Sequence, residues 1–305
     1  MTTDDCIIVG GGPAGLTAAI YLTRFRLRTR LFDCGSSRAS WIPCTRNHAG
    51  YPEGISGNDL LARMREQADK YGVERQDARV ERLTPEDDET FTVHAGDQTY
   101  RARTVLLATG VVNHRPRHLT PEVHDPAVAR GLLRYCPVCD GYEVTDRKVG
   151  VIGTGDHGMR EALFLRSYTR DVTLIAPEAE HALDPACAAK LDDAGIARIN
   201  GPCGGYAIEG HQLAFDTARG RMAFDSVYPA LGSRIRSRLA VEAGAKATDE
   251  GCLEVDDHQR TTVPGLFAAG DVVKGLDQIS HAMGEAGVAA TTMRNLLSEQ
   301  RPLRR

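Results

Sequence analysis

The stretch CIIVGGGPAGLTAAIYLTRFRLRTRLFD, residues 6–33, decides the fold. An apolar strand leads directly into the pattern G-x-G-x-x-G formed by Gly10, Gly12 and Gly15, and a helical pattern and a second strand follow. The first glycine permits a tight turn, the second lets backbone N–H groups approach a pyrophosphate, and the third lets helix and strand pack closely. Asp33 ends the second strand, where a carboxylate accepts hydrogen bonds from a ribose. The stretch predicts a dinucleotide-binding α/β unit.

A second unit of the same design covers residues 148–175, KVGVIGTGDHGMREALFLRSYTRDVTLI, with Gly153, Gly155 and Gly158 as its glycine pattern. A chain of 305 residues is too long for one compact core and suits two domains of ordinary size.

The end of the chain has no glycine turn of its own. Residues 261–272 predict a buried strand, and residues 279–297 a helix rich in small residues. Both fit a return of the chain to the first domain. We therefore expect an α/β fold with two Rossmann-like three-layer domains, the second inserted into the first. The expected division is 1–114 and 246–305 for the outer domain and 115–245 for the central one.

Composition and charge exclude several classes. The formal charge of −4 argues against a nucleic-acid partner and against a basic membrane patch. No apolar segment is long enough and free enough of glycine to predict a membrane span. The acidic start, MTTDD, is unlike a secretory signal, so cytoplasmic residence is the expectation. The arginine cluster from Arg24 to Arg30 is interpreted as a solvated helix end and turn.

Eight cysteines in such a compartment are expected to be mostly buried thiols, but one pair is closely spaced. Cys136 and Cys139 form a CxxC directly before the second glycine unit. A CxxC at a helix start has a lowered thiol pKa, and the adjacent Asp140 is placed to shuttle a proton. A redox disulfide is the leading interpretation. A zinc site and an inert structural pair are the alternatives, although the other cysteines offer no second close pair of ligands, so no metal site is predicted.

The motifs GGGPAG, LLATG, VPGLFAAGD and CPVCDGYE together resemble those of the low-molecular-weight thioredoxin reductase family, over essentially the whole chain. The resemblance implies a homodimer, an FAD domain built from both chain ends, and a central domain carrying the dithiol. It also implies that Cys139 faces the flavin and that Cys136 exchanges with the disulfide of a partner. The catalytic residues would be Cys136, Cys139 and Asp140.

The same resemblance implies a set of FAD contacts spread over the outer domain and the loop after its second strand. Asp271 would bond the ribityl or phosphate portion, and Gln278 and Ile279 would face the N1–O2 edge of the flavin. Asn47 stands where the family has an FAD-contacting asparagine. The full set is Gly10, Gly12, Pro13, Ala14, Gly15, Asp33, Cys34, Arg38, Asn47, Val80, Ala108, Thr109, Gly110, Gly270, Asp271, Gln278 and Ile279.

The second glycine unit departs from the family. Family members that use NADPH carry a basic HRRxxxR run after the strand, and here Ala176, Pro177, Glu178 and Ala182 stand at those positions. A 2′-phosphate would lose charge-assisted hydrogen bonds of roughly 1.5–3 kcal/mol each. Ala176 also occupies the place equivalent to Asp33. We expect NADPH not to be the efficient donor. Weak NADH binding and no nucleotide at all both stay open for this turn.

The loop between Asp33 and Asp59 contains two further candidates. His48 is either a proton relay or a solvated loop histidine, and Cys44 is interpreted as a plain thiol.

The expected function is an FAD-dependent disulfide oxidoreductase that moves electrons between FAD, Cys136–Cys139, and a thioredoxin-like protein or small disulfide. NADH, ferredoxin or another reduced carrier would be the donor. One alternative is a dithiol oxidase that uses O₂, and a second is a flavin-binding sensor without turnover.

Overall fold

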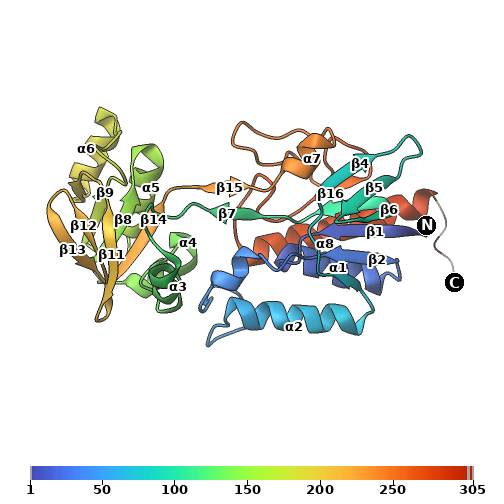
Figure 1. Ribbon diagram of the computed structural model, residues 1–305, viewed down its shortest axis with the longest axis horizontal. Coiled ribbons are helices and arrows are strands. Elements are labelled where there is room, and N and C mark those ends of the chain that lie inside the picture. The colour runs from blue at the N-terminus through green and yellow to red at the C-terminus, as the bar shows by residue number, and fades with distance from the viewer. Residues whose placement is uncertain (1, 301–302, 304–305) are drawn as a thin grey trace. The chain divides into compact units, whose positions relative to one another are not determined.

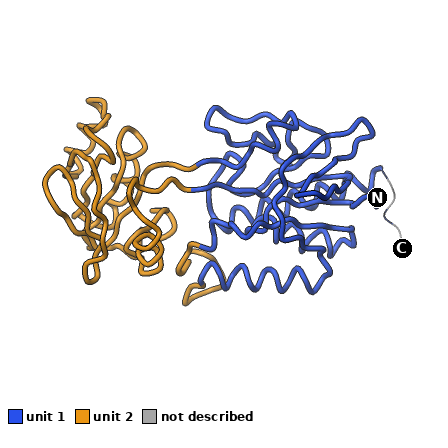
Figure 2. The backbone as a smooth tube through the Cα atoms, in the orientation of Figure 1, with its two compact units in different colours: residues 1–40, 56–112, 234–305 blue, residues 41–55, 113–233 orange. Residues whose placement is uncertain are grey.

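The computed structural model describes residues 2–300 and 303 and divides into two compact units. Unit 1 comprises the chain up to Ser40, Ser56–Val112 and the chain from Arg234 on (Figure 2). Unit 2 comprises Trp41–Ile55 and Asn113–Ser233. The sequence set the second boundary at residue 245. In the structure the segment after Arg234 belongs to unit 1, because Leu239 and Ala240 are buried in the apolar core of that unit.

Unit 1 is built on a seven-stranded sheet with the order β3-β2-β1-β6-β5-β4, in which β16 also pairs with β6 (Figure 1). Strands β1, β2, β3, β6 and β16 are mutually parallel where they pair, while β5 and β4 continue the sheet antiparallel. The strands are β1 (Thr3–Val9), β2 (Thr29–Phe32), β3 (Glu74–Gln76), β4 (Arg82–Pro85), β5 (Phe91–Ala95), β6 (Gln98–Leu107) and β16 (Leu266–Ala268).

Helices cover this sheet because their apolar faces need a partner. Helix α1 contacts β1, β2, α2 and α8, and α8 contacts β6 and β16, so the two ends of the chain meet in one layer. Helix α7 packs against β4. The helices are α1 (Pro13–Arg24), η1 (Arg38–Trp41), α2 (Gly57–Lys70), α7 (Arg238–Glu242) and α8 (Ile279–Gln300).

Unit 2 has three layers. Its centre is a four-stranded parallel sheet, β10-β9-β8-β14. Helices α5 and α6 pack on one side through an apolar cluster that includes Met159, Leu165 and Leu191. The antiparallel sheet β11-β12-β13 packs through another cluster, which includes Phe215 and Phe224. The strands are β8 (Val149–Gly153), β9 (Val172–Ile175), β10 (Ala197–Ile199), β11 (Gly204–Glu209), β12 (Gln212–Thr217), β13 (Gly220–Phe224) and β14 (Ser226–Ala230).

The remaining helices of unit 2 are α3 (Pro121–Ala129), α4 (Pro137–Asp140), η2 (Gly141–Val144), α5 (Gly155–Leu165) and α6 (Pro185–Asp193). Where the chain passes between the units, β7 (Val111–Asn113) and β15 (Ser233–Ile235) pair as a two-stranded sheet. The observed architecture is the α/β fold with two Rossmann-like domains that the sequence predicts.

Two sequence-based predictions of local structure were wrong. The strand expected over 261–272 is only β16, because Gly265 and Gly270 adopt left-handed backbone angles on either side of it. Arg30 is not solvated: it lies buried in β2, and its Nε donates to Asp4 Oδ2 at 2.7 Å. No helix within the described part of the chain is both long and apolar enough to cross a membrane.

Candidate functional site

The first glycine turn has the geometry of a pyrophosphate cradle. Gly10 has φ +119°, and a Cβ there would lie 2.2 Å from the carbonyl oxygen of Ala108. A Cβ on Gly15 would lie 1.8 Å from the carbonyl oxygen of Gly10. Helix α1 starts with no side-chain cap and no acidic residue in its first turn. Its first N–H groups and positive dipole end are therefore suited to a phosphate.

Asp33 lies over this turn. A Cβ on Gly11 would come within 2.2 Å of Asp33 Oδ2, and Asp33 Oδ1 accepts a hydrogen bond from the N–H of Gly35 at 2.9 Å. Arg65 lies 3.4 Å from the other carboxylate oxygen. A carboxylate fixed beside a glycine turn fits the ribose of a dinucleotide. The turn and Asp33 thus fit the pyrophosphate and ribose of a dinucleotide.

The other predicted FAD contacts of unit 1 come from several of its strands and helices. Ala108, Thr109 and Gly110 follow β6, and the Thr109 hydroxyl donates to the carbonyl of Arg236 at 2.7 Å. Cys34 is exposed after β2, and Val80 is buried in the apolar core. Pro13 and Ala14 open α1, while Gln278 and Ile279 stand at the start of α8.

Arg38 is shared by two carboxylates, Asp271 and Asp277. Its Nη1 lies 3.0 Å from Asp271 Oδ2 and 2.9 Å from Asp277 Oδ2. The N–H of Gly270 donates to Glu285 Oε2 at 2.7 Å. Burial and the neighbouring Asp271 raise the pKa of Asp277 to about 6, against the opposing effect of Arg38. The sequence named Arg38, Gly270 and Asp271 but missed Asp277 and Glu285, which have no motif of their own.

This raised pKa gives a testable dependence of stability on pH. The folded state holds the Asp277 proton more tightly than the unfolded state, so stability falls as pH rises from about 4 to about 6. We expect Asp277→Asn to raise the free energy of unfolding at pH 7.5 by about 1 kcal/mol, allowing for solvent screening of a half-exposed side chain, and to change little at pH 4.5. Thermal unfolding of the two proteins at both pH values checks this. An equal change at both values would contradict it.

In unit 2, Cys136 and Cys139 are joined by a disulfide at the start of α4. Cys136 is the N-cap residue, and its Sγ accepts a hydrogen bond from the N–H of Cys139 at 3.2 Å. Helix α4 is a single turn, with Pro137 at its first position and Asp140 at its last. The predicted placement of the CxxC at a helix start is correct.

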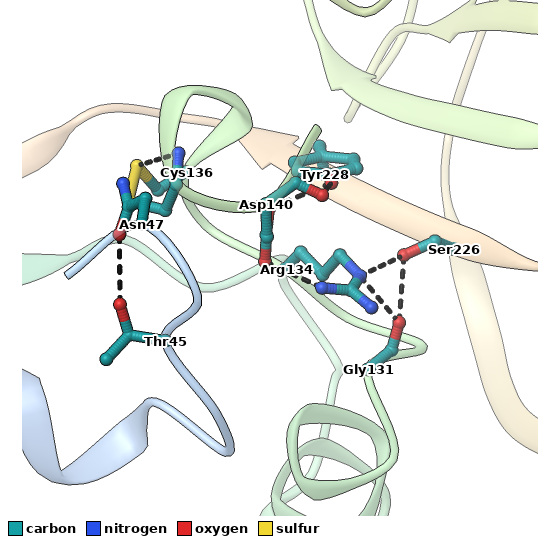
Figure 3. A network of polar contacts seen from close by, with 9 residues as sticks. Thr45, Asn47, Gly131, Arg134, Cys136, Asp140, Ser226 and Tyr228 are labelled. Carbon is teal, nitrogen blue, oxygen red and sulfur yellow. Dashed lines mark hydrogen bonds and ion pairs between the residues drawn. A yellow bond between two sulfur atoms is a disulfide. The ribbon is translucent and has the colours of Figure 1, made fainter. Parts of the chain in front are cut away.

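Asp140 is partly buried, and both of its carboxylate oxygens accept hydrogen bonds (Figure 3). Arg134 Nη1 donates to Oδ2 at 2.8 Å, and the hydroxyl of Tyr228 donates to Oδ1 at 2.9 Å. Burial raises the pKa of Asp140, while Arg134 and Tyr228 counter that rise. The sequence named Asp140 but missed both partners. Tyr228 lies inside the buried strand β14, 88 residues further along the chain. From the sequence alone it is interpreted as an ordinary core residue.

The loop 41–55 groups with unit 2 and holds the remaining candidates. Asn47 Oδ1 accepts a hydrogen bond from the Thr45 hydroxyl at 2.9 Å (Figure 3). The His48 ring stacks on Tyr51 with 5.6 Å between centroids, and burial lowers the pKa of His48. Cys44 is a half-buried free thiol, 3.9 Å from the carbonyl oxygen of Glu53.

The second glycine turn is covered by the loop that follows β9. The N–H of Ala182 donates to Thr154 Oγ1 at 2.7 Å, and His181 Nδ1 lies 3.4 Å from the same oxygen. A Cβ on Gly155 would lie 3.5 Å from the carbonyl oxygen of Ala182. The loop is thus held against the turn at which a nucleotide would bind.

The other side of this loop is fixed to the chain after β10. The N–H of Gly201 donates to the carbonyl of Ala179 at 2.6 Å, and the N–H of Cys203 donates to the carbonyl of Pro177 at 3.1 Å. Glu178 is paired with Arg117 at 3.0 Å. Asp156 adds an acidic side chain to the first turn of α5. Within residues 2–300 and 303, no cluster of three His, Cys, Asp or Glu side chains could hold a metal ion.

The family model described as pyridine nucleotide-disulphide oxidoreductase matches residues 4–286. The chain belongs to this family. A thioredoxin reductase of Mycolicibacterium smegmatis is 34% identical, with 98% of each chain covered. A bifunctional thioredoxin reductase/thioredoxin of Mycobacterium leprae is 32% identical over 98% of this chain and 67% of its own. The crystal structure of thioredoxin reductase from Streptococcus pyogenes has a TM-score of 0.88 at 27% identity, covering 97% of this chain and 99% of that one.

This pyridine nucleotide-disulphide oxidoreductase is therefore of the thioredoxin reductase-like type, a flavoprotein disulfide oxidoreductase. Membership of the family implies FAD, and the cradle at Gly10–Gly15 with Asp33 fits it. When bound, FAD would supply hydride-transfer and one-electron chemistry that protein side chains do not supply.

Proposed function

We propose that the chain passes electron pairs between FAD and the Cys136–Cys139 dithiol, and between that dithiol and a thioredoxin-like protein or a small disulfide. The observation that carries this proposal is the disulfide at the start of α4, with a carboxyl group on the next residue. The curated relatives named thioredoxin reductase support thioredoxin as the partner class. The homodimer, the cytoplasmic location and the individual FAD contacts predicted from the sequence are part of the same proposal.

The proposed donor is not NADPH. The first and third positions of the missing HRRxxxR run hold a buried Ala176 and an acidic Glu178, which is ion-paired with Arg117. The loop that is bonded to Thr154 and Gly201 also lies beside this turn, which supports the proposal. NADH, reduced ferredoxin or another reduced carrier is left as the donor, and NADH would face the same loop.

The covered glycine turn also favours a second candidate function, a dithiol oxidase. In that reaction a substrate dithiol reduces Cys136–Cys139 and becomes a disulfide, the electron pair passes to FAD, and O₂ accepts it. No nicotinamide nucleotide is needed in this direction. The contacts of Ala182 and His181 with Thr154 are the observation that favours it.

Anaerobic titration of the FAD-loaded protein separates these functions. We expect the flavin absorbance to be bleached by dithiothreitol, a small dithiol, and not by NADPH at micromolar concentration. Bleaching by NADH or reduced ferredoxin would select a reductase, and rapid reoxidation by O₂ after dithiothreitol would select the oxidase. Cys139→Ser is the matched control, because it blocks entry of electrons through the dithiol and not entry directly to FAD. Bleaching by micromolar NADPH would overturn the proposal on the donor.

A further inference from the structure

Arg134 and Tyr228 approach Asp140 from two elements that are distant in the sequence (Figure 3). Arg134 lies in the segment before the CxxC, and Tyr228 lies in β14 of the central sheet. Their donor atoms are 2.8 and 2.9 Å from the two carboxylate oxygens of Asp140. The Tyr228 hydroxyl also lies 3.2 Å from the backbone carbonyl oxygen of Asp140. The residue after Cys139 is therefore fixed in both its side chain and its backbone.

Arg134 is itself held rigidly. Its Nε lies 2.9 Å from the carbonyl oxygen of Gly131 and 3.1 Å from Ser226 Oγ, and the Ser226 hydroxyl donates to the same carbonyl at 2.9 Å. Its backbone N–H donates to the carbonyl of Val227 at 2.9 Å. A guanidinium with this many bonds keeps one position, so it acts as a fixed positive charge beside Asp140.

The groups around Asp140 shift its pKa in both directions. Three groups face the carboxyl: Arg134 and Tyr228 favour its ionised form, and Glu143 in η2 disfavours it. Burial is the largest influence and raises the pKa of Asp140. Because a buried carboxylate without its counter-charge is strongly disfavoured, the removal of Arg134 would raise this pKa further.

A thiol–disulfide exchange at this site needs a proton to be delivered and returned. When a thiolate of dithiothreitol attacks Cys136 Sγ, a mixed disulfide forms and Cys139 leaves as a thiolate that takes a proton. The second thiol of the reagent then closes its cyclic disulfide and releases Cys136. Two electrons and two protons pass from the reagent to the enzyme. Asp140, the residue directly after Cys139, is the partly buried acid to which we assign this proton.

We propose that Arg134 is a positioning residue for this exchange: together with Tyr228 it fixes the carboxyl of Asp140, the residue after Cys139, and sets the pH range over which that carboxyl exchanges its proton. The proposal rests on the proposed dithiol function. It adds a residue that has no role in the CxxC motif and that acts only through Asp140.

Anaerobic stopped-flow reduction of the FAD-loaded protein by dithiothreitol tests this, with the flavin absorbance as the signal. The rate is measured against pH for four proteins: unaltered, Asp140→Asn, Arg134→Met, and the double variant. Each rate is divided by the rate of the same protein with Asp140→Asn at the same pH, which cancels the ionisation of the reagent. The part of the pH profile that remains, here called the limb, reports the ionisation of Asp140. This ratio falls as pH rises through the pKa of Asp140. We expect the limb to move upward by roughly 1 unit or more in the Arg134→Met background.

Arg134→Lys and Tyr228→Phe are the companion variants. Lysine keeps the charge, so we expect it to return the limb most of the way to its position in the unaltered protein. Tyr228→Phe removes one hydrogen bond and should shift the limb upward by less than Arg134→Met does. Thermal unfolding of each variant shows whether unit 2 is still folded.

Each outcome decides a different point. If dithiothreitol reduces the flavin of the unaltered protein but the limbs coincide with and without Arg134, the proposed function stands and Arg134 has no positioning role. A loss of rate by the same factor at every pH would make Arg134 a structural anchor only. If dithiothreitol leaves the flavin of the unaltered protein oxidised, the proposed function and this inference both fail. Should Arg134→Met not fold, the limb in Tyr228→Phe decides, and an unshifted limb there overturns the proposal.

Discussion

Replacing Cys139 with serine should abolish electron transfer between dithiols and FAD and leave FAD bound. Serine keeps the shape of the side chain but cannot form the disulfide with Cys136 that the structure contains. We expect the rate of flavin reduction by dithiothreitol to fall at least roughly 10³-fold, because the thiol is a reacting atom and no neighbour replaces it. The measurement is anaerobic flavin bleaching, with the ratio of flavin to protein absorbance recorded after gel filtration.

The reason for retention of FAD lies in the division of the chain. The glycine turn, Asp33 and Asp271 belong to unit 1, whereas Cys139 belongs to unit 2. Loss of the disulfide lowers the free energy of unfolding by about 2 kcal/mol through chain entropy. Unaltered protein treated with excess reductant also lacks the disulfide and is the reference for this effect. Cys252→Ser changes a half-buried free thiol of unit 1 and is the matched control, expected to keep the rate. A colourless Cys139→Ser protein would contradict the assigned role.

Local sequence signals predicted the elements that hold the cofactor and the dithiol. Gly10, Gly12 and Gly15 predict β1, the turn and α1, because this glycine spacing between an apolar strand and a helical pattern is typical of a strand–turn–helix unit. The helix start at Pro137 is likewise local, since Cys136 caps it and proline is favoured at the first helical position. Signals of this kind need no knowledge of the rest of the chain.

Two of the misses depend on contacts between distant segments. Arg30 lies opposite Ile7 in the sheet, and the carboxylate that pairs with it comes from Asp4, so its burial follows from strand register and not from its charged neighbours. Tyr228 meets Asp140 only because β14 pairs with β8 in one particular register. No sequence period reveals either contact.

At the second glycine turn, too, the sequence does not reveal a contact between distant segments. The missing basic residues after β9 are visible in the sequence, at Ala176, Pro177, Glu178 and Ala182. Whether the loop bends toward the turn or away from it depends on the Thr154 hydroxyl and on bonds from Gly201 and Cys203. The sequence could thus show what the turn lacks but not what covers it.

Gly15→Val should remove FAD and destabilise unit 1, the second of the two largest effects that we expect. A Cβ at Gly15 would lie 1.8 Å from the carbonyl oxygen of Gly10, and both groups are backbone of the tight turn, so neither can move without opening it. Overpacking of this kind costs about 1–3 kcal/mol or more, and loss of the bound cofactor removes its own stabilisation as well. The flavin-to-protein absorbance ratio and the thermal midpoint are the measurements.

Variants of two other glycines serve as controls for Gly15→Val. One crowds a turn that is not expected to bind FAD, and the other replaces a glycine without crowding. Gly158 has the equivalent position in the second turn, where a Cβ would lie 2.8 Å from the carbonyl carbon of Gly153; Gly158→Val should destabilise unit 2 while FAD stays bound. Gly284 is an exposed residue of α8 where a Cβ would have no atom within 4 Å, and Gly284→Ala should stabilise the protein by about 0.5–1 kcal/mol. If Gly15→Val kept its flavin, or if Gly158→Val lost it to the same extent, the first turn would not be the FAD cradle. The pattern of flavin retention across these three variants therefore decides which of the two glycine turns holds the cofactor, independently of any electron donor.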